Sequence, residues 1–190
     1  MRGVRWIRMA SLALVLAGLG AMASALWVPA KAELAQVLLQ RAWRVSQESG
    51  AAQRPWMWAD HTTVAQLQVP SHGVDQIVLA GDSGAVLAFA PGENMQARQA
   101  DGAHIISGHR DTHFRFLEYV RPGTEILLKT LEGERRFQVT HTQVANARTT
   151  KLDPHGLQGG LVLVTCYPFD ALQAGGDERY LVFAKPADTT

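Results

Sequence analysis

Between residues 63 and 185 the sequence alternates short apolar segments with turn residues, and no long helical pattern interrupts the series. This alternation constrains the fold strongly, because short strands must pair with one another to bury their apolar side chains. Glycine-containing turns at 81–84 and 132–133 separate neighbouring segments, and the second is typical of a hairpin. The segments with the length and composition of strands are residues 63–69, 76–80, 85–90, 104–107, 125–130, 134–144, 161–165 and 179–185. The pattern predicts an all-β barrel or sandwich.

The N-terminus has the pattern of a membrane-inserted segment. Three arginines lie within residues 1–8, and an almost unbroken apolar run follows at 9–28. About 20 apolar residues suffice to cross a bilayer as a helix, and the preceding arginines predict a cytoplasmic N-terminus with the rest of the chain translocated. Residues 23–25, Ala-Ser-Ala, also fit a signal-peptidase site. The length of the run and Trp27 near its end favour an uncleaved anchor in the cytoplasmic membrane, with the remaining chain on the extracytoplasmic or periplasmic side.

The sequence between the apolar run and the strand-rich region divides into a helix and a linker. Helical spacing predicts an amphipathic helix over residues 32–47. The residues that follow this spacing are Leu34, Val37, Leu38, Arg41 and Val45. A polar stretch of small residues at 46–55 is typical of a linker. The chain is therefore divided into a basic cytoplasmic segment (1–8), a transmembrane anchor (9–28), an amphipathic helix with its linker (29–57) and a folded domain (58–190).

Charge and cysteine content exclude several classes of function. With 18 basic and 17 acidic side chains and a net charge of +1, the chain lacks the basic excess of a nucleic-acid-binding protein. Cys166 is the only cysteine, which excludes an internal disulfide and a cysteine-rich zinc or iron–sulfur site. A single cysteine is usually a small core residue, but an exported thiol is prone to oxidation unless it has a chemical role.

Three segments place reactive side chains where a strand begins or ends. An apolar strand at 105–107 leads into a polar turn that contains His109. A second apolar strand ends at Cys166, shortly before Pro168, which prevents regular continuation. A pair of glycines precedes the last strand, whose first residue is Arg179.

These three residue types suit acyl transfer. A cysteine attacks a carbonyl as the thiolate, and a histidine can take its proton and later protonate the leaving amine. An arginine keeps its proton at working pH, so it is a poor base but a good donor to an oxyanion or to a substrate carbonyl. We therefore predict Cys166 as the nucleophile, His109 as base and acid, and Arg179 as the charge stabiliser.

His109 and His113 also have the i, i+4 spacing of a helical zinc site. That motif requires a glutamate after the first histidine and a helical setting, whereas here Arg110 follows His109 and a strand precedes it. A cation beside the ligands repels a metal ion. We predict no metal site and no cofactor.

The same segments resemble the sortases, a family of cysteine transpeptidases. Ser-Gly-His-Arg-Asp-Thr-His-Phe at 107–114 is similar to the region of their catalytic histidine, and Leu-Val-Thr-Cys at 163–166 is similar to the signature around their catalytic cysteine. Arg179 falls where the family has its arginine, and the order His, Cys, Arg agrees. The Thr-Cys-Tyr-Pro-Phe-Asp and Gly-Gly-Asp-Glu-Arg-Tyr segments look most like the sortases of Gram-negative bacteria.

The resemblance implies a closed eight-stranded β-barrel with short helices, with residues 58–190 as the catalytic domain behind the transmembrane helix. It also implies that Cys166 cleaves the Thr–Gly bond of an LPxTG-like C-terminal sorting signal on a substrate protein. A thioester forms, and an amine acceptor of unknown identity resolves it. Thr165 and Asp111 resemble family residues that shape the substrate groove and orient the site. Val162 departs from the family, since it stands where threonine is common, and this bears on substrate detail more than on catalysis.

Two other interpretations remain open from the sequence. A cysteine peptidase, or an L,D-transpeptidase acting on peptidoglycan, also pairs cysteine with histidine. The L,D-transpeptidase histidine, however, lies shortly before its cysteine in a Ser-x-Gly-Cys context that this chain lacks. The other interpretation is a non-catalytic β-barrel binding module, which requires Cys166 to be sealed in the core while His109 and Arg179 point elsewhere.

Overall fold

The chain divides into two compact units, Met1–Val37 and Leu38–Thr190, in a computed structural model that describes residues 2–150, 152–157, 159–171 and 176–187. Helix α1 (Arg2–Ser49) accounts for the described part of the first unit and continues into the second. It is one helix, whereas the sequence predicted separate helical segments on either side of Pro29. Among the described residues, no helix is both long and apolar enough to cross a membrane. The predicted transmembrane span at 9–28 is therefore not confirmed.

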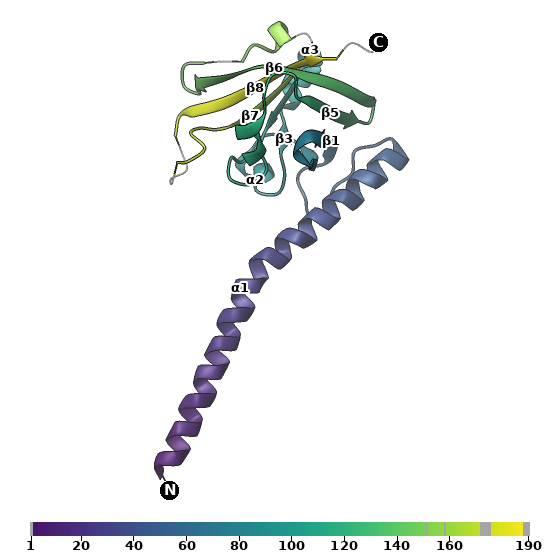
Figure 1. The fold of residues 1–190 in the computed structure, drawn as a ribbon. Helices are drawn as coiled ribbons and strands as arrows, with labels where there is room; N and C mark the ends of the chain where they lie inside the picture. Colours follow the sequence, from purple (N-terminus) through teal and green to yellow (C-terminus); the bar gives the residue numbers. More distant parts are fainter. Residues whose placement is uncertain (1, 151, 158, 172–175, 188–190) are drawn as a thin grey trace. The chain divides into compact units, whose positions relative to one another are not determined.

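The second unit contains a closed barrel of eight strands in the order β1-β2-β3-β4-β7-β8-β6-β5, and Figure 1 shows this barrel. The strands are β1 (Thr63–Val69), β2 (Val74–Ala80), β3 (Gly92–Glu93), β4 (His104–Ser107), β5 (Glu125–Thr130), β6 (Gly133–Asn146), β7 (Leu161–Cys166) and β8 (Glu178–Pro186). Short helices lie in the connections: η1 (Pro70–His72), α2 (Gly84–Leu87), α3 (Met95–Asp101), η2 (Arg115–Tyr119) and η3 (Pro154–Leu157). Two pairs are parallel, β2 with β3 and β4 with β7. The expected closed barrel is confirmed, as a mixed rather than a purely antiparallel sheet.

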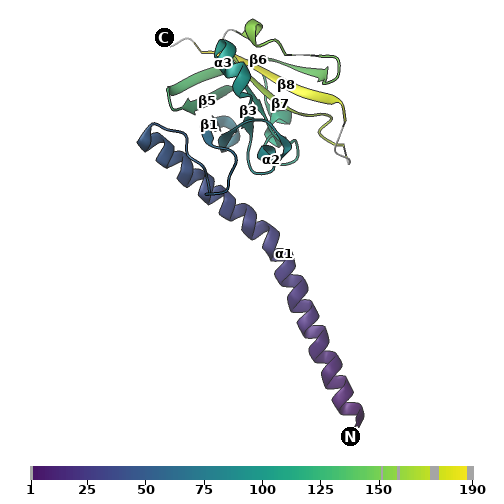
Figure 2. The same ribbon diagram turned by 180° about the vertical axis from the view of Figure 1, so that it is seen from behind.

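The third strand is where the barrel departs from the sequence prediction. The strand predicted over 85–90 is wrong, because Gly84–Leu87 forms α2 and the strand is instead the two-residue β3. An apolar run without alternation does not distinguish strand from helix, and alanine and leucine favour helix. Figure 2 shows β3 between α2 and α3. Its close approach requires Gly92, since a Cβ there would lie 2.0 Å from the carbonyl oxygen of Gly81.

The last turns of α1 pack on the wall of the barrel. Trp43 is 3% exposed and lies in an apolar cluster with Ile77 and Leu79 of β2. Its Nε1 donates to Gln66 Oε1 at 3.2 Å. The polar partner on the barrel side lets the indole be buried without an unsatisfied N–H.

The buried face of α1 is not the face that the sequence predicted. Val45 is exposed and Leu38 is only half-buried. The buried residues of these turns are Leu39, Ala42, Trp43 and Ser46. Ser46 reaches the barrel through a 2.9 Å hydrogen bond between its hydroxyl and that of Thr63. The buried face thus includes a serine, and hydrophobic periodicity does not mark a polar side chain as part of the packed face.

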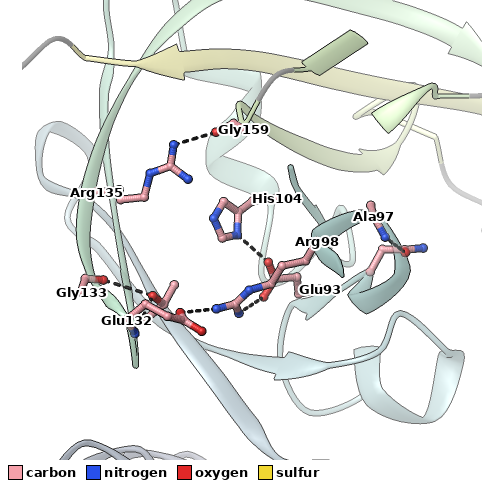
Figure 3. A network of polar contacts seen from close by, with 10 residues as sticks. Glu93, Ala97, Arg98, His104, Glu132, Gly133, Arg135 and Gly159 are labelled. Carbon is pink, nitrogen blue, oxygen red and sulfur yellow. Dashed lines mark hydrogen bonds and ion pairs between the residues drawn. The ribbon is translucent and has the colours of Figure 1, made fainter. Parts of the chain in front are cut away.

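A buried polar network lies at the start of β4, at the opposite end of that strand from the His109 turn (Figure 3). Glu93 on β3 is fully buried, and its carboxylate accepts a hydrogen bond from Arg98 Nη1 at 3.2 Å. Its other oxygen lies 2.6 Å from His104 Nδ1. Arg98 also pairs with the exposed Glu132. Because buried charges need partners, this network fixes β3, β4 and α3 to one another.

Candidate active site

The parallel pairing of β4 with β7 sets the positions of two predicted catalytic residues. Ser107 is paired with Val164 in that register, and His109 and Cys166 each follow two residues later. Parallel strands run in the same direction, so the turn that bears His109 and the end of β7 that bears Cys166 are neighbours. The amide of Gly108 donates to the Val164 carbonyl at 3.0 Å, which extends the pairing past the end of β4.

Arg179 reaches the same end of the barrel through the antiparallel pairing of β7 with β8. Cys166 is paired directly with Arg179, and directly opposed residues project from the same face of a sheet. Cys166 and Arg179 are both half-buried, so the thiol is not sealed in the core. Arg179 Nη1 donates to the carbonyls of Gly176 at 2.7 Å and Glu178 at 2.8 Å. The structure thus brings the three predicted catalytic residues to one end of the barrel.

Thr165 ties the histidine turn to β7. Its side chain is 2% exposed, and its hydroxyl donates to the carbonyl of Gly108 at 2.8 Å. The resemblance implied a groove-shaping role for Thr165, which stays a prediction; in this structure the hydroxyl has a buried partner in the turn. Gly108 in turn lies against the ring of Phe114, where a Cβ would come within 2.7 Å of the ring. Only glycine permits this approach.

His109 is exposed at the tip of this turn, where a base that must reach a substrate has to lie. Its carbonyl accepts a hydrogen bond from the Phe114 amide at 2.9 Å, which closes the turn. The pKa of His113, in the same turn, is lowered from its usual value by burial and, less strongly, by the charge of His109. His113 is therefore neutral near neutral pH.

Asp111 is paired with Arg110. Its two carboxylate oxygens accept hydrogen bonds from Arg110 Nε at 2.8 Å and Nη2 at 3.0 Å. These hydrogen bonds are the main reason that the pKa of Asp111 is lowered, and the charges of Arg110, Arg115 and His109 lower it further. The carboxylate was expected to orient the site, and in this structure its hydrogen bonds are with Arg110.

A groove of about 550 Å³ lies on the outer face of the barrel beside Arg179. Its apolar floor comes from β4, β7 and β8, and its rim is polar. The floor includes Ile105, Val164 and Leu181, and the rim includes Asp82, Asn94 and Asn146. Side chains two residues apart on a strand share a face, so Cys166 continues the row that Val164 begins. The groove floor therefore leads towards the thiol.

Sequence reasoning missed one residue of this end of the barrel. Arg110 was interpreted only as a charge that would repel a metal ion from His109, yet its side chain is 7% exposed and hydrogen-bonded on several sides. The sequence shows an arginine between a histidine and an aspartate, but it does not show that this arginine is buried.

In the described ranges, no group of three or more histidine, cysteine, aspartate or glutamate side chains is arranged to hold a metal ion.

Comparison with known proteins gives a consistent family. The model of the sortase domain matches residues 67–187. Sortase D of Bacillus subtilis strain 168 is 25% identical over 122 residues, which cover 63% of this chain and 61% of that protein. Sortase A from Corynebacterium diphtheriae has a TM-score of 0.59 at 23% identity, over 70% of this chain and 64% of that one. A Clostridium perfringens sortase D5 transpeptidase has a TM-score of 0.54 at 22% identity, over 66% of this chain and 79% of that one.

These comparisons select among the interpretations that the sequence left open. The likenesses to solved structures, at 23% and 22% identity, show a shared fold. The chain spans 61% of the length of the sortase D that it matches. The family model covers more than half of the chain and includes the segments of all three predicted catalytic residues. The match favours the sortases over the L,D-transpeptidases. The chain belongs to the sortase family.

Proposed function

We propose that this protein is a membrane-anchored transpeptidase that cleaves an LPxTG-like C-terminal sorting signal and joins the released protein to an amine. The observation that carries the proposal is the convergence of His109, Cys166 and Arg179, which follows from the β4–β7 and β7–β8 registers. The groove beside Arg179 adds an apolar surface on which a peptide could lie with its scissile bond at the thiol.

The first half of the reaction cleaves the Thr–Gly bond of the signal. The Cys166 thiolate attacks the threonine carbonyl carbon, and a C–S bond forms while the carbonyl oxygen takes the negative charge. The tetrahedral intermediate collapses, the C–N bond breaks, and His109 gives its proton to the leaving amine. A thioester to Cys166 and a neutral His109 remain.

The second half transfers the acyl group. His109 takes a proton from the incoming amine as that amine attacks the thioester carbonyl. The C–S bond then breaks, a new amide forms and Cys166 returns to the thiolate. In both halves a guanidinium N–H of Arg179 stabilises the oxyanion. In the present structure Arg179 Nη1 donates to the Gly176 and Glu178 carbonyls, and the residue is paired with Cys166 in the β7–β8 register.

The finer assignments rest on sequence features. The segments at 165–170 and 175–180 support a place among the sortases of Gram-negative bacteria. Such cells lack a thick wall, so the acceptor amine stays unassigned. The apolar run at 9–28 behind three arginines supports an anchor in the cytoplasmic membrane with the barrel on the extracytoplasmic side.

The anchor is tested with the full-length chain produced in a Gram-negative host. We expect the protein to stay in the membrane pellet after alkaline carbonate extraction, and its intact mass to include the N-terminal residues. Protease added to spheroplasts should digest the barrel. Release by carbonate, or a mature N-terminus just after Ala25, would contradict an uncleaved anchor.

The reaction is tested with the full-length protein in detergent, an LPxTG peptide and hydroxylamine as the amine. We expect the hydroxamate of the peptide up to its threonine, no product from Cys166→Ala or His109→Ala, and about 10²–10³-fold less from Arg179→Ala. His141→Ala on the exposed part of β6 is a matched control that should keep wild-type activity. Peptide binding without any product would favour a non-catalytic module, and product from peptidoglycan stem peptides alone would favour the L,D-transpeptidase reaction.

A further inference from the structure

Arg110 is a buried arginine in the exposed turn that carries His109. Its guanidinium donates to four oxygens: both carboxylate oxygens of Asp111, the carbonyl of Pro168 at 2.7 Å and the carbonyl of Ala171 at 2.9 Å. An arginine has five N–H donors in a fixed plane, so these contacts use most of its capacity. A side chain this buried and this fully bonded is held in one orientation.

The two backbone partners belong to the segment that follows the nucleophile. Pro168 and Ala171 lie shortly after Cys166, in the connection from β7 to β8. Arg110 therefore joins two segments that are far apart in sequence, the turn after β4 and the segment after β7. Thr165 makes a similar link on the inner side of the same junction through its bond to the Gly108 carbonyl. The pair of links fixes His109 and Cys166 relative to each other from both sides.

Arg110 also interacts electrostatically with the segment after β7. The hydrogen bonds that it donates to Asp111 are the main cause that raises the pKa of Arg110, and coulombic interactions with Asp111, Cys166 and Asp170 raise it further. Arg179 on β8 and His109 in the turn after β4 lie at the same end of the barrel.

We propose that Arg110 is a positioning residue for the transfer reaction. It holds the segment after Cys166 against the His109 turn. Its part in catalysis rests on the transpeptidase function proposed above, whereas its part in holding the two segments together does not. No bond to Arg110 forms or breaks during the reaction.

The test compares Arg110→Gln, which removes the charge, with Arg110→Lys, which keeps the charge but not the planar donor arrangement. Arg135→Gln is the matched control, because Arg135 also donates to a loop carbonyl, that of Gly159 at 2.9 Å, but at the opposite end of β7. Each full-length variant is measured for amide hydrogen exchange in residues 166–171, for kcat and KM with an LPxTG peptide and hydroxylamine, and for thermal unfolding.

For Arg110→Gln we expect faster amide hydrogen exchange in residues 166–171, and kcat to fall about 10²-fold with little change in KM. Arg110→Lys lacks the planar donor arrangement, so its kcat should stay at least about 10-fold low. Arg135→Gln should match the wild type in both measurements. If Arg110→Gln does not fold, Arg110→Lys decides, and full kcat in that variant overturns the positioning role. Amide exchange and a kcat of Arg110→Gln equal to those of Arg135→Gln also overturn the proposal. A wild type that transfers nothing refutes the transpeptidase function, and the amide exchange still tests Arg110.

Discussion

Ser107 and Val164 lie opposite each other in the parallel pair of β4 and β7. From these two residues each strand continues to a predicted catalytic side chain, His109 on one and Cys166 on the other. A slip of one residue in this register would turn the side chains after Val164 to the other face of the sheet. The geometry of the site therefore depends on the turn and contacts that hold these two strand ends. Substitutions there should lower activity more than equally destabilising substitutions elsewhere.

Gly108→Ala tests the packing under the histidine turn. The added Cβ would lie 2.7 Å from the Phe114 ring, so the ring or the turn must move. We expect a loss of about 1–3 kcal/mol in the free energy of unfolding, measured by urea denaturation, together with a fall in kcat. Gly84→Ala in α2 is the control, since no atom lies within 4 Å of its Cβ position. Unchanged stability and kcat in Gly108→Ala would refute the tight turn.

Glu93→Gln tests the buried network at the other end of β4. Glu93 is fully buried and its carboxylate contacts both Arg98 and His104. Removing one charge of a buried network leaves the others uncompensated, so we expect a loss of about 3–5 kcal/mol. Glu132→Gln, which removes the exposed partner of the same arginine, should cost less than about 1 kcal/mol. Equal losses in the two variants, measured by urea denaturation, would contradict this ranking. The kcat of the folded fraction should stay near wild type in both.

The sequence predicted most of the barrel because its strands carry the signal in their own residues. The strands predicted at 63–69, 104–107 and 125–130 have those same bounds in β1, β4 and β5. The two-residue β3 could not be found in this way, since its place depends on the close approach of Gly92 to the Gly81 carbonyl. The buried face of α1 was also not predicted. It includes Ser46, and hydrophobic periodicity does not mark a polar side chain as buried.

The residues of the candidate site could also be predicted only in part from the sequence. Cys166, His109 and Arg179 were identified from residue chemistry and from likeness to a family, and the strand registers place them together. Arg110 could not be assigned, because its partners at Pro168 and Ala171 are distant in sequence. For the same reason the inward direction of Thr165 became clear only from its bond to Gly108.

We expect the free energy of unfolding to fall in mild acid because of His113. Its pKa in the folded protein is lowered by burial and by the charge of His109, whereas the unfolded chain has the ordinary value of about 6.5. Below that value the unfolded state binds more protons than the folded state, so the free energy of unfolding decreases as the pH falls towards the lowered folded value. His113→Asn should therefore flatten the decline between about pH 7 and pH 5, followed by urea denaturation. A decline as steep as in the wild type would rule out this source.

Trp43→Ala tests the packing of α1 on the barrel. The indole is 3% exposed, contacts β2 and donates to Gln66. Its loss leaves a cavity and an unpaired acceptor, so we expect the free energy of unfolding to fall by about 3–5 kcal/mol. Arg44→Ala, at the exposed neighbouring position, should change it by less than about 0.5 kcal/mol. Similar unfolding midpoints for Trp43→Ala and the wild type would show that this part of α1 does not stabilise the barrel.

The central claim is that Cys166 forms a thioester with the cleaved signal. The full-length protein is mixed with an LPxTG peptide in the absence of any added amine, quenched in acid and examined by intact-mass and peptide mass spectrometry. We predict a mass increase equal to the peptide up to its threonine, located on Cys166, removed by hydroxylamine and absent from Cys166→Ala. An adduct on another residue, or transfer to hydroxylamine by Cys166→Ala at the wild-type rate, would contradict the account.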